Sequence, residues 1–158
     1  YGLYVRRAFA GRRVLDGAAA VLLAVALVHL VFVQVLFQNP LSNHTPVGDL
    51  PLLNTLALAY LLPALLGALY AWSAARRGDR LTFGVAGVAA LLLALLWLSL
   101  EVRRLFQGSY LDGDAVTDAE RWAYTATWIL YGAALFAAGL RWDAKALRAA
   151  SLAVLMLA

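Results

Sequence analysis

The charged residues with the most suggestive spacing for chemistry lie where a long apolar segment ends. Twenty uncharged residues (81–100) lead directly into Glu101 and Arg104. Residues three apart lie on one face of a helix, so this carboxylate and guanidinium can pair, and Trp97 falls on the same stripe. Such a pair at a membrane surface can bind a polar substrate or can join helices. The candidate external polar layer predicted at this level comprises Asn54, Glu101, Arg104 and Tyr124.

A second polar group falls near the middle of the expected membrane and comprises His29, Tyr60 and Tyr131. Pro63 has no N–H for the Ala59 carbonyl, so the second span should be kinked or locally unwound there, and a phenol or imidazole could use the freed acceptor. Ionisable groups at this depth suit proton relay, ligand binding or metal ligation, although helix packing is the commoner role. No cofactor is predicted; the alternative left open is axial ligation of a haem or a chlorophyll-type pigment by His29.

The remaining motifs do not complete a catalytic or metal site. The acidic segment 112–120 does not fit an EF-hand loop, because Val116, Thr117 and Ala123 stand where a ligand, a glycine and a glutamate are needed. Absence of cysteine excludes disulfides and thiol catalysis. No nucleophile with its base, metal-ligand set or phosphate loop can be assembled, so no catalytic residue is predicted and a non-enzymatic role is favoured.

Composition assigns the chain to a membrane. Of 158 residues, 64% are hydrophobic and 14% are charged, with a mean hydropathy of +0.78, whereas soluble domains carry about a quarter charged residues. The net charge of +4 comes from basic residues at the ends of apolar segments, which is typical of membrane anchoring. The expected partners are therefore the lipid bilayer and further transmembrane helices of the same or other chains, with no nucleic acid.

These segments predict an all-α fold, a polytopic transmembrane helical bundle with four complete spans and the start of a fifth. Each complete span reaches the roughly 20 residues that a bilayer requires. The apolar residues 149–158 would rise only ~15 Å as a helix, so the fifth span, at about 144–158, is predicted to be truncated. Residues 1–15 are predicted to be a basic interfacial segment or the end of a preceding span, and residues 16–158 the bundle. The complete spans are expected at about 17–38, 50–75, 81–103 and 118–140.

The thirteen basic residues predict the orientation of the bundle. Ten lie in segments 1–15, 76–80 and 141–148, and three lie between residues 103 and 121. By the positive-inside rule the amino end is cytoplasmic, and the connections 38–50 and 101–121 are external.

Turn and packing signals mark the helix ends. Gly78 before Asp79 predicts a helix stop followed by a new cap, so the second and third spans should form an antiparallel hairpin. Thr117 and Glu120 form a capping box that should open the fourth span. Further caps are predicted at Asp49 and Asp143, and a seam of small residues at Ala86, Ala90 and Ala94.

Four motifs in order resemble the carboxy-terminal part of the large bacterial predicted membrane proteins called domain of unknown function 2339. The resemblance covers residues 48–158 well and the first span by its apolar character. It implies a multi-pass protein of the bacterial inner membrane with more spans than this chain contains, and it implies no particular activity. The motifs are residues 48–54 continuing to 59–64, residues 98–108, residues 117–128 and residues 146–152.

Two functional interpretations follow from these observations. The leading one is a non-catalytic structural or accessory bundle within a larger polytopic protein or membrane complex. The alternative is a transporter, or a membrane enzyme acting on a lipid-linked substrate, with its site in the external half of the bundle around the polar layer.

Overall fold

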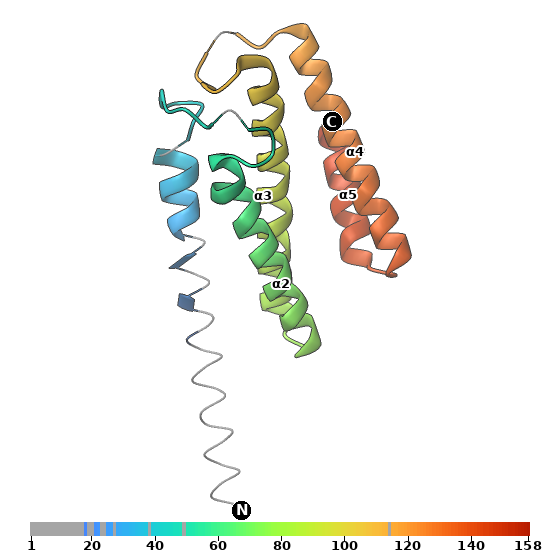
Figure 1. Ribbon diagram of the computed structural model, residues 1–158. Helices are drawn as coiled ribbons and strands as arrows, with labels where there is room; N and C mark the ends of the chain where they lie inside the picture. The colour runs from blue at the N-terminus through green and yellow to red at the C-terminus, as the bar shows by residue number, and fades with distance from the viewer. Residues whose placement is uncertain are drawn as a thin grey trace, which may run out of the picture. The chain divides into compact units, whose positions relative to one another are not determined.

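The computed structural model describes residues 18, 21–22, 25–26, 28–37, 39–48, 50–113 and 115–158 (Figure 1). The chain divides into two compact units, residues 1–39 and residues 40–158, and each is described by itself. In the first unit, the described residues up to Phe37 are helical, and Leu30–Phe37 form the π-helix η1. The predicted basic segment 1–15 and part of the predicted first span lie outside the described residues.

The second unit is built from helices, and no strand occurs among the described residues, so the all-α prediction is confirmed. Among the described residues, three helical segments are long and apolar enough to cross a membrane: Ala57–Arg76, Arg80–Gln107 and Asp118–Arg141. The predicted four complete spans and partial fifth are therefore not established. The described residues contain three helices of sufficient length, and the last helix has only 13 residues. In chain order the elements are η2 (Ala57–Leu61), α2 (Leu62–Arg76), α3 (Arg80–Gln107), α4 (Asp118–Arg141) and α5 (Lys145–Leu157).

The helix of the second span begins later than residue 50, which corrects the predicted boundary. Residues 50–54 are bends, and Leu52 has a φ of 63°, a left-handed conformation that a helix cannot contain. The side-chain oxygen of Asn54 accepts a hydrogen bond from the N–H of Ala57 at 3.1 Å, as a helix cap does. The cap predicted at Asp49 lies outside the described residues.

The predicted disturbance before Pro63 is confirmed, and it takes the form of the π-helix η2. The N–H of Leu62 donates to the carbonyl of Ala57, five residues earlier, instead of four. Because Pro63 cannot donate an N–H, the wider π turn rearranges the hydrogen bonds just before it.

Helices α2 and α3 form the predicted antiparallel hairpin, packed through small residues. A Cβ atom added to Gly67 would lie 3.4 Å from Cβ of Ala90, and one added to Gly87 would lie 3.9 Å from Cβ of Ala71. Ala86 and Ala90 are buried and Ala94 is half-buried, so the first two residues of the predicted stripe form a packing seam. Small side chains let the helix backbones approach closely, which favours association in lipid.

Helix α4 runs antiparallel to α3, and two hydrogen bonds join them along their length. The indole N–H of Trp128 donates to Oγ of Ser99 at 3.0 Å, and the hydroxyl of Tyr131 donates to the Leu91 carbonyl at 2.9 Å. Helix α5 returns against α4 in the same antiparallel manner. A Cβ atom added to Gly139 would lie 3.0 Å from the backbone nitrogen of Arg148, so glycine is needed for this close approach.

The turn between α2 and α3 has the predicted chemistry. Gly78 has a φ of 74°, its N–H bonds to the Ala75 carbonyl, and the N–H of Asp79 bonds to the Ala74 carbonyl, which together form a Schellman motif. The Asp79 carboxylate then accepts from the N–H of Thr82 at 3.0 Å. Hydrogen bonding by Thr82 holds the pKa of Asp79 below its ordinary value of 3.8.

The cap predicted at Asp143 is wrong. Helix α5 begins at Lys145 after Ala144, which makes no side-chain cap. Asp143 instead has a φ of 47°, and its carboxylate bonds to the guanidinium of Arg148 at 3.0 Å. The Asp143 carboxylate therefore pairs with Arg148, five residues later, and does not cap α5.

The antiparallel register gives the second unit two distinct ends. We call residues 75–80 and 141–148, the two tight turns with the helix residues beside them, the turn end. We call residues 40–56 and 101–124, where the second-span helix begins and where the last turns of α3 pass to the first turns of α4, the loop end. The polar side chains that the sequence singles out near Glu101 lie at the loop end.

Candidate functional site: two buried polar clusters at the loop end

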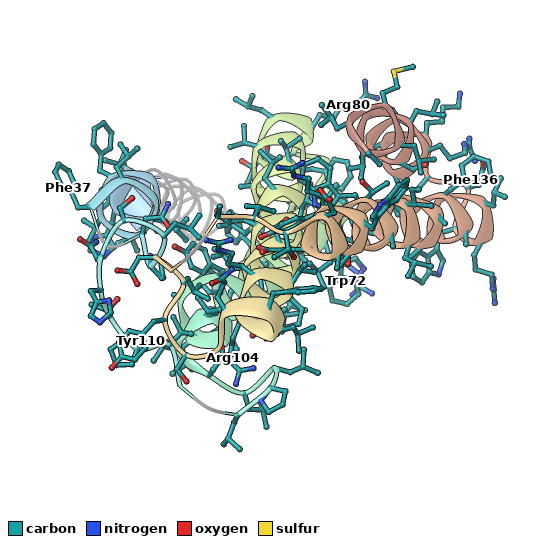
Figure 2. All side chains as sticks on the ribbon, turned by 90° about the horizontal axis from the view of Figure 1, so that it is seen from above. Phe37, Trp72, Arg80, Arg104, Tyr110 and Phe136 are labelled. Carbon is teal, nitrogen blue, oxygen red and sulfur yellow. The ribbon has the colours of Figure 1, made fainter. Side chains whose placement is uncertain are left out.

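Two clusters of buried polar side chains flank the last turns of α3. Arg103 and Gln107, four residues apart, share one face of the helix, and Glu101 and Arg104, three apart, share another. Figure 2 looks down on this end of the second unit, with Arg104 and Tyr110 labelled. The helical period thus sends neighbouring charged residues to different partners.

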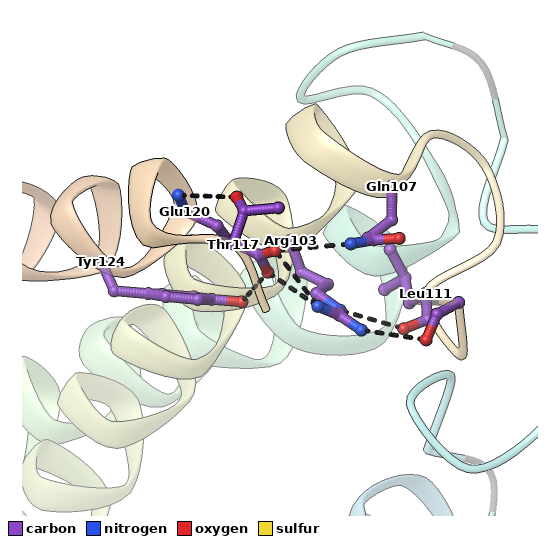
Figure 3. A network of polar contacts seen from close by, with 7 residues as sticks. Arg103, Gln107, Leu111, Thr117, Glu120 and Tyr124 are labelled. Atoms are coloured by element: carbon purple, nitrogen blue, oxygen red, sulfur yellow. Dashed lines mark hydrogen bonds and ion pairs between the residues drawn. The ribbon is translucent and has the colours of Figure 1, made fainter. Parts of the chain in front are cut away.

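The Glu120 cluster consists of Arg103, Gln107, Glu120 and Tyr124 and joins α3 to α4 (Figure 3). The side chain of Glu120 is 0% exposed, and its two carboxylate oxygens lie 3.0 and 3.2 Å from Nη1 of Arg103. The Tyr124 hydroxyl donates to the same carboxylate at 3.0 Å, and the Gln107 amide donates at 3.4 Å. Three side chains from two helices therefore bond this single buried carboxylate.

Arg103 also holds the connection between the two helices. Its Nε donates to the Leu111 carbonyl at 3.1 Å, and Nη2 donates to the Gly113 carbonyl at 3.4 Å. Leu111 itself is fully buried. One guanidinium thus binds the carboxylate of α4 and the loop that leads to it.

The predicted capping box at the start of α4 is present in part. Oγ1 of Thr117 accepts from the N–H of Glu120 at 3.2 Å, which confirms the predicted cap. In a complete capping box the glutamate side chain reaches back to the N–H of the cap residue. Here the carboxylate of Glu120 bonds Arg103 on α3, so a local capping residue also makes a contact between helices.

The Glu101 cluster consists of Asn54, Glu101 and Arg104 and joins α3 to the start of the second-span helix. The side-chain amide of Asn54 donates to Oε1 of Glu101 at 2.5 Å, and Nη1 of Arg104 lies 3.8 Å from Oε2. The Arg104 Nε also donates to the Gly48 carbonyl at 3.0 Å. All three side chains are buried. The predicted pairing of Glu101 with Arg104 is confirmed as an ion pair at 3.8 Å, and Asn54 donates a hydrogen bond to the same carboxylate.

The two loops of this end contact each other directly. The ring of His44 stacks on Tyr110 with centroids 4.4 Å apart, and its Nδ1 lies 2.9 Å from a carboxylate oxygen of Asp112. The N–H of Val47 donates to the Ser109 carbonyl at 2.9 Å. Two segments far apart in the sequence, residues 44–47 and 109–112, therefore contact each other at the loop end.

The structure brings together three of the four residues predicted for the polar layer. Asn54, Glu101 and Arg104 share one cluster, whereas Tyr124 bonds Glu120 on the other side of α3. Their role in binding or catalysis stays a prediction.

The predicted mid-membrane group is spread over both units. The hydroxyl of Tyr131 donates to the Leu91 carbonyl, so it makes a packing contact with α3. Tyr60 is buried in η2. His29 is exposed and belongs to the first unit, which is described separately, so its proximity to the tyrosines and the ligation of a pigment stay predictions.

Sequence reasoning missed the pairing of Arg103 with Glu120, although signals for it were present. Arg103 and Gln107 offer donors on one face of α3, and Glu120 lies at the start of the antiparallel helix that follows. Only the fold brings these residues, 17 positions apart, into contact. Among the described residues, no group of three or more histidine or acidic side chains could hold a metal ion.

The long apolar helices, with buried polar side chains between them, are typical of an integral membrane protein. The family model described as "Predicted membrane protein (DUF2339)" matches residues 2–158. The chain therefore belongs to this family of membrane proteins, and the resemblance noted from four motifs is confirmed and extends to the first span. No curated protein and no solved structure matches the sequence.

Proposed function

We propose that this chain is a non-catalytic structural bundle within a larger polytopic membrane protein or a membrane complex. The observation that carries the proposal is the mutual pairing of the buried charges at the loop end. Glu120 accepts hydrogen bonds from three side chains, and Glu101 accepts from Asn54 with Arg104 beside it. Donors and acceptors that bond one another in this way hold helices together, whereas a binding site presents them to a ligand.

Both clusters act between elements, which supports a structural role. Lipid offers transmembrane helices no hydrophobic gain on association, so small-residue seams and hydrogen bonds between helices keep them together. The Glu101 cluster links α3 to the helix start at Asn54, and the Glu120 cluster links α3 to α4. The bonds of Trp128 and Tyr131 continue the link between α3 and α4 along the span.

The proposal includes an orientation in the bacterial inner membrane, with the amino end cytoplasmic and the loop end external. Support comes from the ten basic residues that lie in the amino-terminal segment and at the turn end. Three of the thirteen basic residues, Arg103, Arg104 and Arg121, lie near the loop end. The positive-inside rule counts lysine and arginine residues, which are enriched on the cytoplasmic side of membrane proteins.

Substitution of the Glu101 cluster distinguishes this proposal from the alternative of a transporter or lipid-linked-substrate enzyme. A structural cluster predicts that Glu101→Gln and Arg104→Gln lower the thermal stability of the detergent-purified protein. The exposed Arg121→Gln serves as the control and should leave stability nearly unchanged. Unaltered stability of both cluster variants would contradict the structural role and would favour a substrate site.

A further inference from the structure

We propose that the turn end of the bundle binds the headgroup of an anionic phospholipid through Arg76, Arg77 and Arg80. These residues flank the tight turn between α2 and α3, and all three side chains are exposed. This inference adds a ligand to the bundle and does not depend on whether the loop end is structural.

The two ends of the bundle differ in how their cations are compensated. At the loop end, Arg103, Arg104 and Arg121 each lie within 4.0 Å of a carboxylate. At the turn end, among the described residues, only Arg148 has such a partner, Asp143. The other cations of this end lie beyond ion-pair distance of any described carboxylate: Arg76, Arg77, Arg80, Arg141 and Lys145.

Side-chain contacts fix two of these guanidinium groups beside aromatic rings. The guanidinium of Arg76 lies 3.7 Å from the centroid of the Trp72 ring. Arg77 donates from Nη1 to Oγ of Ser73 at 3.2 Å and lies 5.7 Å from the Tyr70 ring. Tryptophan and tyrosine prefer the headgroup level of a bilayer, so these contacts hold the cations at the depth of lipid phosphates.

The start of α3 places a third exposed cation, Arg80, beside Arg76 and Arg77. Arg80 is the first residue of this 28-residue helix, and the first turn contains no acidic residue. The N-cap carboxylate of Asp79 already compensates the positive end of the helix dipole, so the start of α3 contributes the exposed Arg80 cation and no separate anion site. Helix α4, at the loop end, begins instead with Asp118 and Glu120. The only carboxylate in the α2 to α3 turn, Asp79, accepts the N–H of Thr82.

An apolar surface beside the cations favours a phospholipid over other anions. Leu69, Trp72 and Leu81 are 60%, 55% and 78% exposed and lie on the helices that carry the arginines. A phosphatidylglycerol molecule can place its phosphate against the guanidinium groups and its acyl chains along these side chains. Inorganic phosphate or an acidic protein would leave the apolar part of this surface uncovered.

Lipid-dependent thermal stability tests this inference with the intact chain in detergent. Added phosphatidylglycerol should raise the Tm by about 5 °C near saturation. Phosphatidylcholine and inorganic phosphate should each produce little change. The triple variant Arg76→Gln, Arg77→Gln, Arg80→Gln should lose the shift, whereas Arg121→Gln, which removes an exposed arginine at the other end, should keep it.

A single substitution keeps the test decisive if the triple variant does not fold. Arg80→Gln removes one exposed cation, and native mass spectrometry should show roughly fivefold weaker retention of phosphatidylglycerol. Equal retention by Arg80→Gln and the unsubstituted protein would overturn the proposed site. An equal Tm shift from phosphatidylcholine or inorganic phosphate would overturn the assignment to an anionic phospholipid.

Discussion

Replacement of Glu120 by glutamine tests whether the Glu120 cluster holds α3 and α4 together. Glutamine keeps the size of the side chain and one acceptor oxygen, but it removes the negative charge that faces Arg103. The Arg103 Nη1 lies 3.0 Å from Oε1 of Glu120, and the two side chains are 10% and 0% exposed. Water therefore contributes little screening to this pair.

Burial of the pair sets the expected size of the effect. Removal of one partner from a buried ion pair costs about 3–5 kcal/mol, because the other charge stays buried without compensation. Arg103 keeps its bonds to the Leu111 and Gly113 carbonyls, and glutamine can still accept from Tyr124. We therefore expect the lower part of that range, about 3 kcal/mol, or a Tm lower by about 6–12 °C.

A double-mutant cycle provides the assay. Thermal unfolding in detergent is compared for Glu120→Gln, Arg103→Gln and the double variant, with an expected interaction energy of about 1–3 kcal/mol. Asp118→Asn is the matched control, because its partner Arg121 lies 3.3 Å away but the side chains are 90% and 69% exposed. That control should change stability by less than about 1 kcal/mol. Additive losses in the cycle, or an equal loss in the control, would refute the reasoning.

Other parts of the bundle should respond in proportion to their packing and bonding. Gly139→Ala should lower the Tm measured in detergent, because its Cβ would lie 3.0 Å from a backbone nitrogen of α5, whereas Gly84→Ala, with nothing within 4 Å, should not. Glu101→Gln should cost less than Glu120→Gln, about 1–2 kcal/mol in the same unfolding assay, because glutamine can still accept from Asn54 and Arg104 lies 3.8 Å away. Asp79→Ala should destabilise the protein at pH 7; since the folded-state pKa of Asp79 is lowered, its stabilisation is present above pH 3.8 and declines as the pH falls through the folded-state pKa. Tm values of the two proteins, recorded against pH, should therefore converge in acid, and a constant difference would contradict the role of the carboxylate.

Local stereochemistry explains which parts of the fold were predictable. The glycine stop at Gly78, the cap at Thr117 and the disturbance before Pro63 each depend on one residue and its immediate neighbours. The seam at Ala86 and Ala90 follows from helical periodicity alone. These features therefore need no knowledge of which helices meet.

The features that the sequence did not predict depend on the tertiary structure as well as on the local pattern. Glu120 could have bonded the N–H of its own helix cap, and only the antiparallel packing of α4 on α3 directs it to Arg103. Tyr124 lies one helical turn after Glu120 and donates to its carboxylate, so Tyr124 belongs to the Glu120 cluster and not to the Glu101 cluster. The apolar residues 50–53 resemble the start of a span, but the left-handed conformation of Leu52 delays the helix. In each case the local pattern allows two outcomes and the tertiary structure selects one.

Single-cysteine accessibility most directly tests the central claim, a membrane-spanning bundle with its two polar clusters at the external end. The chain contains no cysteine, so each introduced thiol reports one position. The exposed positions Ser42 and Ala115 report the loop end, and Ala75 and Trp142 report the turn end. In intact cells, a membrane-impermeant thiol reagent should label Ser42→Cys and Ala115→Cys, and it should label Ala75→Cys and Trp142→Cys only after permeabilisation. Labelling of the turn-end positions in intact cells, or equal labelling of all four, would contradict the account.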